Sequence, residues 1–455
     1  GYHLRSYDTS LHLTYEFDSF DVVAVSSYKR FDKSIAVDID GGAVNFLALG
    51  TRNISDSFTQ EIRMAGETEG GLKWSTGALF ANVDADSDIG FLAPRNSILA
   101  SSFGPGFAAA GIDLINQLEF KNTNYSMFGQ VDLPVTSQLN LIVGGRIIRE
   151  ELRYAFDSTA FANSDDFEIE TDTALFPLQP SFVGKTNDTL WAGKVNLEYR
   201  TGGGTLLYAG VNRGVKGAAF NAKLPDGGPP LAPSEFPYAP ETLYSFEAGT
   251  KTSLMDGLVR LSAAAFYNDY KDYQTFTLTN ASGIISNNDA HAWGVETNAN
   301  FTFSSAFQGS LALSYTKATV ENVAVAAATA TAPAVIRDVR PAFAPRFQAS
   351  GNLSYDLPLE IAGGTFSLMT DASYTSDFFD NIRNFSAQRH DGYVLVNAGV
   401  SWLSADKSWK LKAYVRNLFE ENYVETAFDI ATLCGCSQIQ YSKPRWWTVS
   451  IRKEF

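Results

Sequence analysis

The C-terminal segment, PRWWTVSIRKEF, restricts the fold of this chain more than any other stretch. Trp447, Val449, Ile451 and Phe455 fall on one face of an extended strand, and Lys453 is the only interruption of that face. The residues between them are polar, which gives the period of two that is typical of a β-strand. An apolar outer face, a polar inner face and a terminal aromatic residue are typical of the closing strand of a bacterial outer-membrane barrel. We therefore predict that the four apolar residues form a signal for the barrel-assembly machinery.

A soluble protein can also end on an edge strand, although charge or proline usually protects such an edge. The composition does not separate these alternatives. The chain has 455 residues, of which 45% are hydrophobic, and a mean hydropathy of -0.10. No apolar run approaches the roughly 18 residues of a transmembrane helix, but a barrel strand needs an apolar residue only at every second position. The net charge of -15 argues against a nucleic-acid partner, because phosphates require a basic surface.

Alternating runs divide the chain into about seventeen expected strands. They cover residues 8–18, 20–31, 57–66, 72–84, 122–133, 138–154, 190–200, 204–214, 241–253, 258–273, 289–303, 307–318, 344–356, 364–376, 391–403, 408–417 and 444–455. The gaps between them alternate between short, turn-rich segments such as TGGG and LMDG and long segments such as 85–121 and 155–189. We interpret the Ala-rich stretches 98–111 and 319–335, which fall in long gaps, as loops.

A transmembrane barrel places short turns at one end and long loops at the other, whereas a soluble barrel has no reason to do so. A β-propeller would show a repeat of about forty residues, and none is visible. We therefore predict an all-β fold, a transmembrane antiparallel β-barrel. Its expected location is the bacterial outer membrane and its lipid, with the long loops outside the cell and the C-terminus in the periplasm.

Motifs that would carry chemistry are scarce. The four histidines, His3, His12, His291 and His390, show no metal-ligand spacing, and no Gly-x-Ser-x-Gly motif occurs. Cys434 and Cys436 are separated by one residue, which fits either a small disulfide or two free thiols. We therefore expect no catalytic residue, no metal site and no cofactor, and predict that the protein is not an enzyme.

Several segments, in order along nearly the whole chain, resemble the barrel of TonB-dependent outer-membrane receptors. They are FTQEIRMAGE (58–67) with LKWSTGALFAN (72–82), LLYAGVNRGVKGAAFN (206–221), ETLYSFEAGTKTSLMDGLVRLSAAAFYNDYKDYQ (241–274), AWGVETNANF (292–301), APRFQASGNLSYDL (344–357), AYVRNLFEENYVE (413–425) and KPRWWTVSIRKEF (443–455). Each motif alone is weak, but their combination and order are specific to that family.

The resemblance implies a receptor for TonB-energised uptake of a scarce nutrient, often a ferric siderophore. Family members carry an N-terminal plug domain, a short motif that binds TonB and a barrel of twenty-two strands. Neither the plug nor about five of the strands is present in residues 1–455, so we expect a partial barrel that reaches TonB through a region preceding Gly1. The chain begins without Met or an apolar leader, so we expect a signal peptide to be either cleaved or missing.

Receptor ligands should bind to the long loops, where aromatic and arginine side chains supply most of the binding energy at buried contacts. The candidates for this role are Phe236, Tyr238, Arg340, Phe378, Phe379, Arg383 and Arg389. The alternative for each residue is that it packs its own loop or lies among lipid headgroups. Two other functions remain open: a passive porin-like channel, which would share the strand pattern, and an outer-membrane hydrolase, which would need a clustered nucleophile and base.

Overall fold

The computed structural model describes residues 1–38, 48–163, 169, 171–279, 282–326, 333–430 and 436–454. Most of these residues belong to one antiparallel sheet of eighteen strands. Its members are β1 (Tyr2–Glu16), β2 (Phe20–Asp38), β3 (Ala48–Glu67), β4 (Lys73–Ala93), β5 (Ile112–Pro134), β6 (Leu139–Ala162), β7 (Ala174–Arg200), β8 (Leu206–Lys216), β11 (Glu241–Leu254), β12 (Val259–Thr279), β13 (Ser282–Thr302), β14 (Phe307–Ala326), β15 (Val335–Val339), β16 (Phe347–Ile361), β17 (Gly364–Thr375), β20 (Tyr393–Ser404), β21 (Trp409–Arg416) and β24 (Trp446–Lys453).

Apart from β15, each of these strands pairs with the next one along the sheet, which is the connectivity of an up-and-down sheet. Because β15 and β16 both pair with β14, they occupy one position in succession, and the eighteen strands fill seventeen positions. Every segment expected from the alternation of the sequence falls on one of these positions, in the same order.

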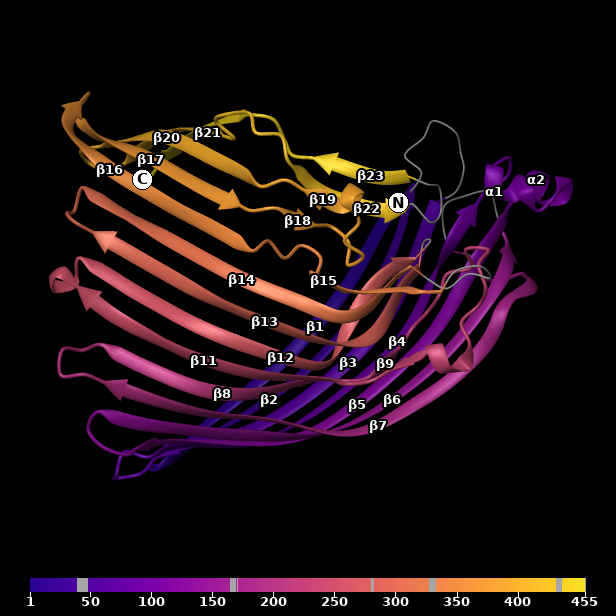
Figure 1. Ribbon diagram of the computed structural model, residues 1–455, viewed down its shortest axis with the longest axis horizontal. Coiled ribbons are helices and arrows are strands. Elements are labelled where there is room, and N and C mark those ends of the chain that lie inside the picture. The colour runs from indigo at the N-terminus through magenta and orange to yellow at the C-terminus, as the bar shows by residue number, and fades with distance from the viewer. Residues whose placement is uncertain are drawn as a thin grey trace.

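The sheet is strongly curved, and its connections are sorted between its two ends (Figure 1). The tight turns, including the 3-10 turn η2 (Met255–Gly257), lie at one end together with the C-terminus. The longer connections lie at the other end, with the N-terminus and the helices α1 (Ile98–Ser102) and α2 (Pro105–Ala110). We call these the turn end and the loop end. Among the described residues, β1 pairs only with β2 and β24 only with β21, so each keeps one unpaired edge.

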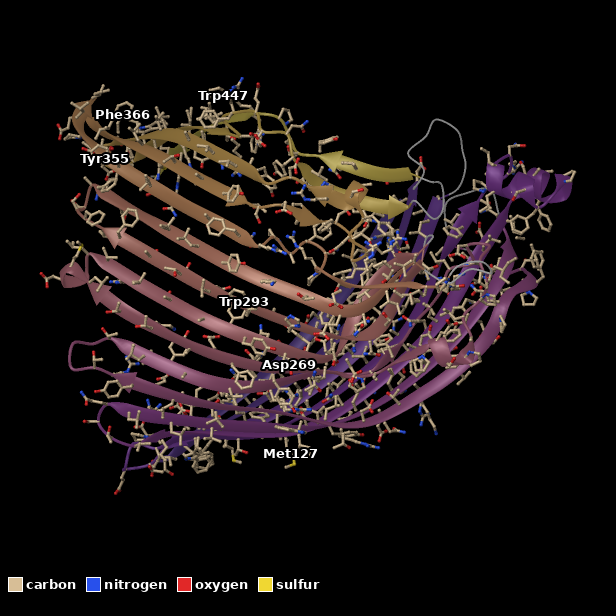
Figure 2. All side chains as sticks on the ribbon, viewed as in Figure 1. Met127, Asp269, Trp293, Tyr355, Phe366 and Trp447 are labelled. Atoms are coloured by element: carbon tan, nitrogen blue, oxygen red, sulfur yellow. The ribbon has the colours of Figure 1, made fainter. Side chains whose placement is uncertain are left out.

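The two faces of the sheet differ in polarity, as the alternation predicted. Met127, Ile147 and Trp191 stand opposite one another on β5, β6 and β7, and their side chains are 66%, 56% and 54% exposed. Met127 points away from the curved sheet in Figure 2, so this apolar face is the outer one. The opposite face carries polar residues such as Glu247 and Asn298. The apolar band and the polar lumen follow from the period of two in a strand.

The C-terminal strand extends the outer apolar face. Trp447, Val449 and Ile451 are exposed and lie opposite Val415, Ala413 and Leu411 of β21. The interruption at Lys453 is accommodated because its Nζ lies 4.7 Å from the centre of the Trp409 ring. Phe455 lies outside the described residues, and the role of this strand in barrel assembly stays a prediction.

The strands reach further toward the loop end than the alternation indicated. β7 begins at Ala174 and not near residue 190, and β14 continues into the Ala-rich stretch as far as Ala326. The stretch 98–111, expected as a loop, forms α1 and α2, and the Ser97 hydroxyl caps α1 by accepting a hydrogen bond from the Ala100 N–H. None of the helices in the described part of the chain is long and apolar enough to cross a membrane.

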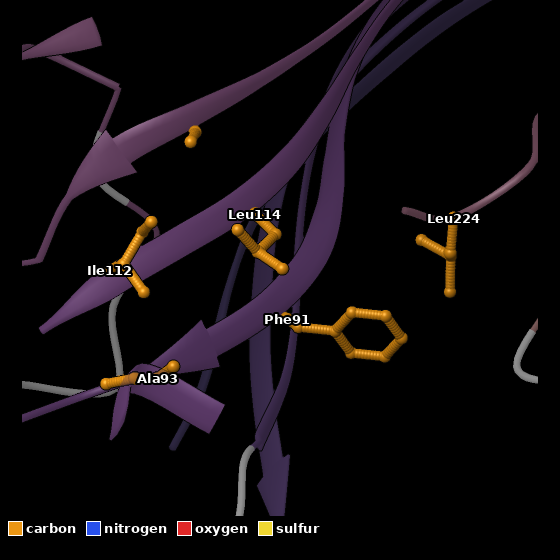
Figure 3. Packing of buried hydrophobic residues seen from close by; sticks show 7 residues of the cluster. Phe91, Ala93, Ile112, Leu114 and Leu224 are labelled. Atoms are coloured by element: carbon orange, nitrogen blue, oxygen red, sulfur yellow. The ribbon is translucent and has the colours of Figure 1, made fainter. Parts of the chain in front are cut away.

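The buried apolar residues gather at the loop end. One cluster joins Phe91 and Ala93 of β4, Ile112 and Leu114 of β5, and Leu224 from the connection between β8 and β11 (Figure 3). Three further clusters lie at the inner loop ends of β3–β7 and β12–β15. The loop end therefore has an interior of its own, whereas the rest of the sheet separates an apolar outer face from a polar inner face.

Candidate functional site

The connection between β8 and β11, residues 217–240, folds back against the inner wall; we call it the inserted segment. It contains the short pair β9 (Ala219–Phe220) and β10 (Pro237–Tyr238). Asn221 anchors it to β13, since its Nδ2 donates to the Ile285 carbonyl at 3.0 Å and its Oδ1 accepts from the Ile285 N–H at 2.8 Å. The side-chain amide of a single asparagine thus binds the segment as another strand would.

The inserted segment encloses an ion pair. Lys223 Nζ lies 2.8 Å from Asp226 Oδ1, and the side chains are 10% and 0% exposed. The same Nζ donates to the Pro229 carbonyl at 2.8 Å, while the Lys223 carbonyl accepts from Asn116 and Gln179 at 2.8 Å. A buried ammonium is tolerated only when it is paired and hydrogen-bonded, so these contacts fix the path of the segment.

Aromatic rings hold the other half of the inserted segment. Phe236 is buried, stacks on Phe182 of β7 with ring centres 4.2 Å apart, and meets Phe156 of β6 edge-on at 5.3 Å. Phe220 stacks on Tyr154 at 5.0 Å. Tyr238 is half-buried, and burial raises the pKa of its hydroxyl above the ordinary value.

A second group surrounds Arg340; we define the Arg340 cluster as Arg340, Asp377, Phe379, Asn384 and Arg389. Arg340 donates to Asp377 Oδ2 at 3.0 Å and to the Asp377 carbonyl at 2.7 Å, and it lies over the Phe379 ring. Arg389 donates to the same carboxylate at 3.3 Å. Burial opposes ionisation of Asp377, but the hydrogen bonds and charges of the two arginines outweigh it and hold its pKa below the ordinary value. Asn384 exchanges hydrogen bonds with the Arg340 backbone.

The segment 377–391 contains every member of the Arg340 cluster except Arg340. It forms a loop whose two ends pair through β18 (Phe378–Phe379) and β19 (Arg389–His390). Phe378 is buried against His390, whose Nε2 lies 3.0 Å from Asp380 Oδ2. Arg383 is also buried and lies over the Phe385 ring at 5.4 Å. Arg389, by contrast, is half exposed, so one cation of the Arg340 cluster remains accessible from outside.

The seven predicted ligand residues therefore fall into two groups at the loop end. Phe236 and Tyr238 belong to the inserted segment, and the other five are Arg340 and four residues of the segment 377–391. Their binding role stays a prediction. The sequence did not single out Asp377, Asn384 or the Lys223–Asp226 pair. The only sequence signal for that pair is its i,i+3 spacing before Gly-Gly-Pro-Pro, which does not show that the residues are buried.

Between the two groups and the turn end, the lumen wall is polar. Tyr208 donates to Glu247 at 2.7 Å across β8 and β11, and Asn122 donates to Glu150 at 2.9 Å across β5 and β6. Gly249 makes the first contact possible, because a Cβ there would lie 2.6 Å from the Tyr208 hydroxyl. Polar groups of this kind suit the passage of a hydrated solute.

The described residues form no group of three or more His, Cys, Asp or Glu side chains that could hold a metal ion. Cys434 lies outside the described residues, and Cys436 begins β23 (Cys436–Tyr441), which pairs with β22 (Val424–Ile430). The chemistry that the loop end offers is that of a binding surface, with paired arginines, aromatic rings and amides held in place by buried contacts.

Comparison with known proteins places these features in context. The family model described as TonB dependent receptor-like, beta-barrel matches residues 1–418. The ferric yersiniabactin uptake receptor FyuA from Yersinia pestis superposes with a TM-score of 0.74 at 16% identity, over 100% of this chain and 62% of that one. The siderophore receptor PiuA from Acinetobacter baumannii gives a TM-score of 0.71 at 14% identity, over 99% and 64%. The copper transporter OprC gives 0.68 at 16% identity, over 100% and 66%.

The chain thus spans about three fifths of the length of the first two structures. At these identities the likeness shows the fold alone, and it confirms the predicted all-β, antiparallel barrel architecture. The proteins compared are transport receptors, which fits the expectation that the chain is not an enzyme.

Proposed function

Because the chain belongs to the TonB-dependent receptor-like β-barrel family, whose members reside in the bacterial outer membrane, we propose that it forms the barrel of a receptor for a scarce nutrient. The proposed nutrient is a ferric siderophore-type iron complex, and the proposed energy source is TonB, reached through an N-terminal plug region. The long loops would face outside and the C-terminus the periplasm. The family match over residues 1–418 is the observation that carries this proposal.

The choice of an iron chelate is supported by what the compared structures are said to bind. FyuA is described as a ferric yersiniabactin uptake receptor and PiuA as a siderophore receptor, whereas OprC is described as a copper transporter. The same fold therefore serves more than one metal. The identity of this chain's ligand must be inferred from the residues at its own loop end.

The loop end offers features that suit an anionic chelate. Arg389 is half exposed and shares Asp377 with Arg340, so a ligand carboxylate or catecholate can compete for its guanidinium. Tyr238 adds a half-buried aromatic ring with a neutral hydroxyl. We propose that these two residues contact the ligand, and that Phe236, Arg340, Phe378, Phe379 and Arg383 contribute to the site mainly by holding the segments that present them.

The test is uptake of radiolabelled iron by cells that carry the complete natural protein as their sole receptor, supplied in turn with ferric catecholate, hydroxamate and citrate. We expect saturable uptake of at least one complex, lost when TonB is deleted. In the Arg389→Gln variant, the concentration for half-maximal uptake should rise about tenfold, the effect of losing one charged hydrogen bond. Lys73→Gln, at the turn end, is the control.

Uptake that rises linearly with concentration and survives the loss of TonB would instead support the passive porin-like channel. The inserted segment is compatible with that alternative, since a loop folded into the lumen could narrow a channel without any plug. Equal binding of all complexes by Arg389→Gln and the natural protein would remove Arg389 from the site without touching the transport proposal.

A further inference from the structure

The inner face of β21, near the C-terminal edge of the curved sheet (Figure 1), carries cations at three heights. The odd-numbered residues of this strand lie opposite the exposed apolar side chains of β24 and face outward. Its even-numbered residues, Lys410, Lys412, Tyr414 and Arg416, therefore face the lumen. At about 3.4 Å per residue, Lys410 and Arg416 are separated by roughly 20 Å along the strand. We call Lys410, Lys412 and Arg416 the cation ladder.

No member of the cation ladder has a carboxylate partner among the residues that the structure describes. Aromatic rings take that place. Lys412 Nζ lies 4.7 Å from the centre of the Tyr414 ring, and the Arg416 guanidinium lies 5.2 Å from the centre of the Trp446 ring. A ring attracts a cation through its quadrupole but does not neutralise it. The ladder is thus held in place and keeps its charge for an anion in the lumen.

Two carboxylates lie close to the turn end of the cation ladder, and both are engaged elsewhere. An oxygen of Glu454 lies 2.7 Å from Arg452, the cation that stands directly opposite Lys410. The carboxylate of Asp406 accepts hydrogen bonds from serine hydroxyls on both sides of it in the turn. Like charges directly opposite on adjacent strands are destabilising, and Glu454 relieves this at Arg452 while Lys410 remains unpaired.

The strands on the other side of β21 bring little negative charge near the ladder. β20 contains no Asp or Glu. The next strand, β17, carries Asp371, which accepts hydrogen bonds from the Tyr414 hydroxyl and from Asn397 Nδ2. Asp356 and Glu360 belong to β16, three strands from β21. At about 4.8 Å per strand they lie roughly 14 Å away, beyond the distance of about 8 Å over which physiological salt screens exposed charges.

Toward the loop end, the cation ladder stops at Arg416. The carboxylates that follow along the chain are Glu420, which lies 2.9 Å from Arg445, and then Glu421 and Glu425. Neither of the last two has an ion pair within the described residues. The ladder therefore covers the lumen from the level of Arg416 down to the turn end, and not the loop end itself.

The inner wall of β7–β13 is built differently. Arg200, Lys251 and Arg260 line a hollow of about 490 Å³ at the turn end of that wall. Two residues nearer the loop end, one register row crosses β7, β8, β11, β12 and β13, and it begins at Glu198 and ends at Glu296. An anion moving down this wall would meet carboxylates before it reached the cations, whereas β21 presents its cations without such a row.

We propose that an anionic solute crosses the lower lumen along the wall of β20, β21 and β24, where Lys410, Lys412 and Arg416 bind its acidic groups in succession. The inference rests on the proposed function, which supplies the anionic ligand and the direction of transport. Arg389 precedes β20, the strand that pairs with β21, so the proposed ligand contact and the ladder lie on adjoining elements. Exposed ion pairs are individually weak, which lets an anion pass from one cation to the next.

The test uses cells that carry the complete natural protein as their sole receptor, supplied with the anionic complexes ferric catecholate and ferric citrate. In the ladder variant, Lys410→Gln/Lys412→Gln/Arg416→Gln, the maximal rate of TonB-dependent uptake should fall about fivefold, the effect of losing one exposed ion pair at each step. Equilibrium binding of the complex to cells without TonB should change by less than about twofold, because the loop end and the ladder are far apart.

Two control variants separate the ladder from charge in general and from packing. Arg200→Gln/Lys251→Gln/Arg260→Gln removes the same number of cations from the turn end of the β7–β13 wall and should transport at the natural rate. Lys410→Arg/Lys412→Arg keeps the charge of the ladder and should do the same. The folded amount of each variant in the outer membrane is measured by its resistance to unfolding in detergent gels without heating.

Uptake at the natural rate by the folded ladder variant, or an equal loss in the β7–β13 control, would overturn the inference. So would passive entry of a large antibiotic into cells with the ladder variant at an unchanged uptake rate, because the cations would then hold the region preceding Gly1 in the lumen. If the natural protein took up neither complex, the proposed function would fail and the inference with it. Uptake without TonB that the ladder variant slows would contradict only the proposed function.

Discussion

The two ends of the barrel are stabilised in different ways. At the turn end, strands are joined by tight turns such as the one at Asp406, whose carboxylate accepts hydrogen bonds from Ser404 and Ser408 within five residues. At the loop end, the inserted segment and the Arg340 cluster are held by contacts between residues far apart in the sequence, such as Asn116 with Lys223. Contacts at the turn end are local and replaceable, whereas those at the loop end depend on one another. Substitutions should therefore lower the stability more at the loop end than at the turn end.

The largest difference should appear with aromatic residues. Phe236→Ala empties a buried position between Phe156 and Phe182, and a buried Phe→Ala change costs about 3–5 kcal/mol. Phe303→Ala, in a tight turn where Phe303 is 48% exposed, should cost less than about 1 kcal/mol. Hydrogen exchange of residues 217–240 and 303–307 measures both. If the backbone amides of residues 217–240 were equally protected from exchange in Phe236→Ala and in the natural protein, the expected difference between the two ends would be contradicted.

A slightly smaller effect is expected from the buried ion pair. Asp226→Ala leaves the Lys223 ammonium buried without its carboxylate, which destabilises by about 3 kcal/mol. The double variant Lys223→Met/Asp226→Ala should recover much of that loss, because it removes the uncompensated charge. If the single and double variants exchange at the same rate over residues 217–240, the pair does not hold the segment.

Arg340→Gln should destabilise the local fold of residues 377–391 by about 2 kcal/mol, since it removes charged hydrogen bonds to Asp377 and to the Ala344 carbonyl. The expected result is faster proteolysis within residues 377–391 at unchanged global stability. Lys73→Gln breaks an exposed pair with Glu67 at the turn end, at 4.0 Å, and should change neither quantity measurably. If residues 377–391 of the Arg340→Gln variant resisted protease as well as in the natural protein, the contacts of Asn384 and the phenylalanines would be sufficient to hold the segment.

The smallest expected effect is a pH dependence. The pKa of Asp377 lies below its ordinary 3.8, because the hydrogen bonds and charges of Arg340 and Arg389 outweigh the opposing effect of burial. Its stabilising contribution is thus complete above pH 3.8 and is lost as the pH falls through the lower folded-state value. Protection of residues 377–391 should stay constant between pH 7 and about 5 and decline only below about pH 4. A decline that begins well above pH 5 would show that Asp377 is not the group responsible.

The sequence predicted the strands well wherever the outer face meets lipid. Alternation between Thr448, Val449, Ser450 and Ile451 follows directly from an apolar outside and a polar inside. It predicted strand ends poorly toward the loops. There, outer positions such as Asp84 and Asp86 of β4 are polar, so the period of two no longer separates the faces although the strands continue.

For the candidate site, the sequence predicted the types of residue but not their contacts. Arginines and aromatic residues of the long loops marked the correct end of the molecule, and the structure brings five of the seven candidates into one neighbourhood. Their partners were not predictable, because Asp377 and Asn384 act through a carboxylate and an amide that resemble any other polar loop residue. The Asn221–Ile285 contact links positions 64 residues apart and leaves no local pattern.

The unpaired edges of β1 and β24 carry a consequence for assembly. Each exposes a row of backbone N–H and C=O groups, and a bilayer core offers no water to satisfy them. Such an edge is a template for any extended strand of matching length. Chains of these 455 residues, refolded without further strands, should therefore associate edge to edge through a heterologous contact, and the size of the product should grow with protein concentration. The protein concentration would then set the number of chains in each assembly.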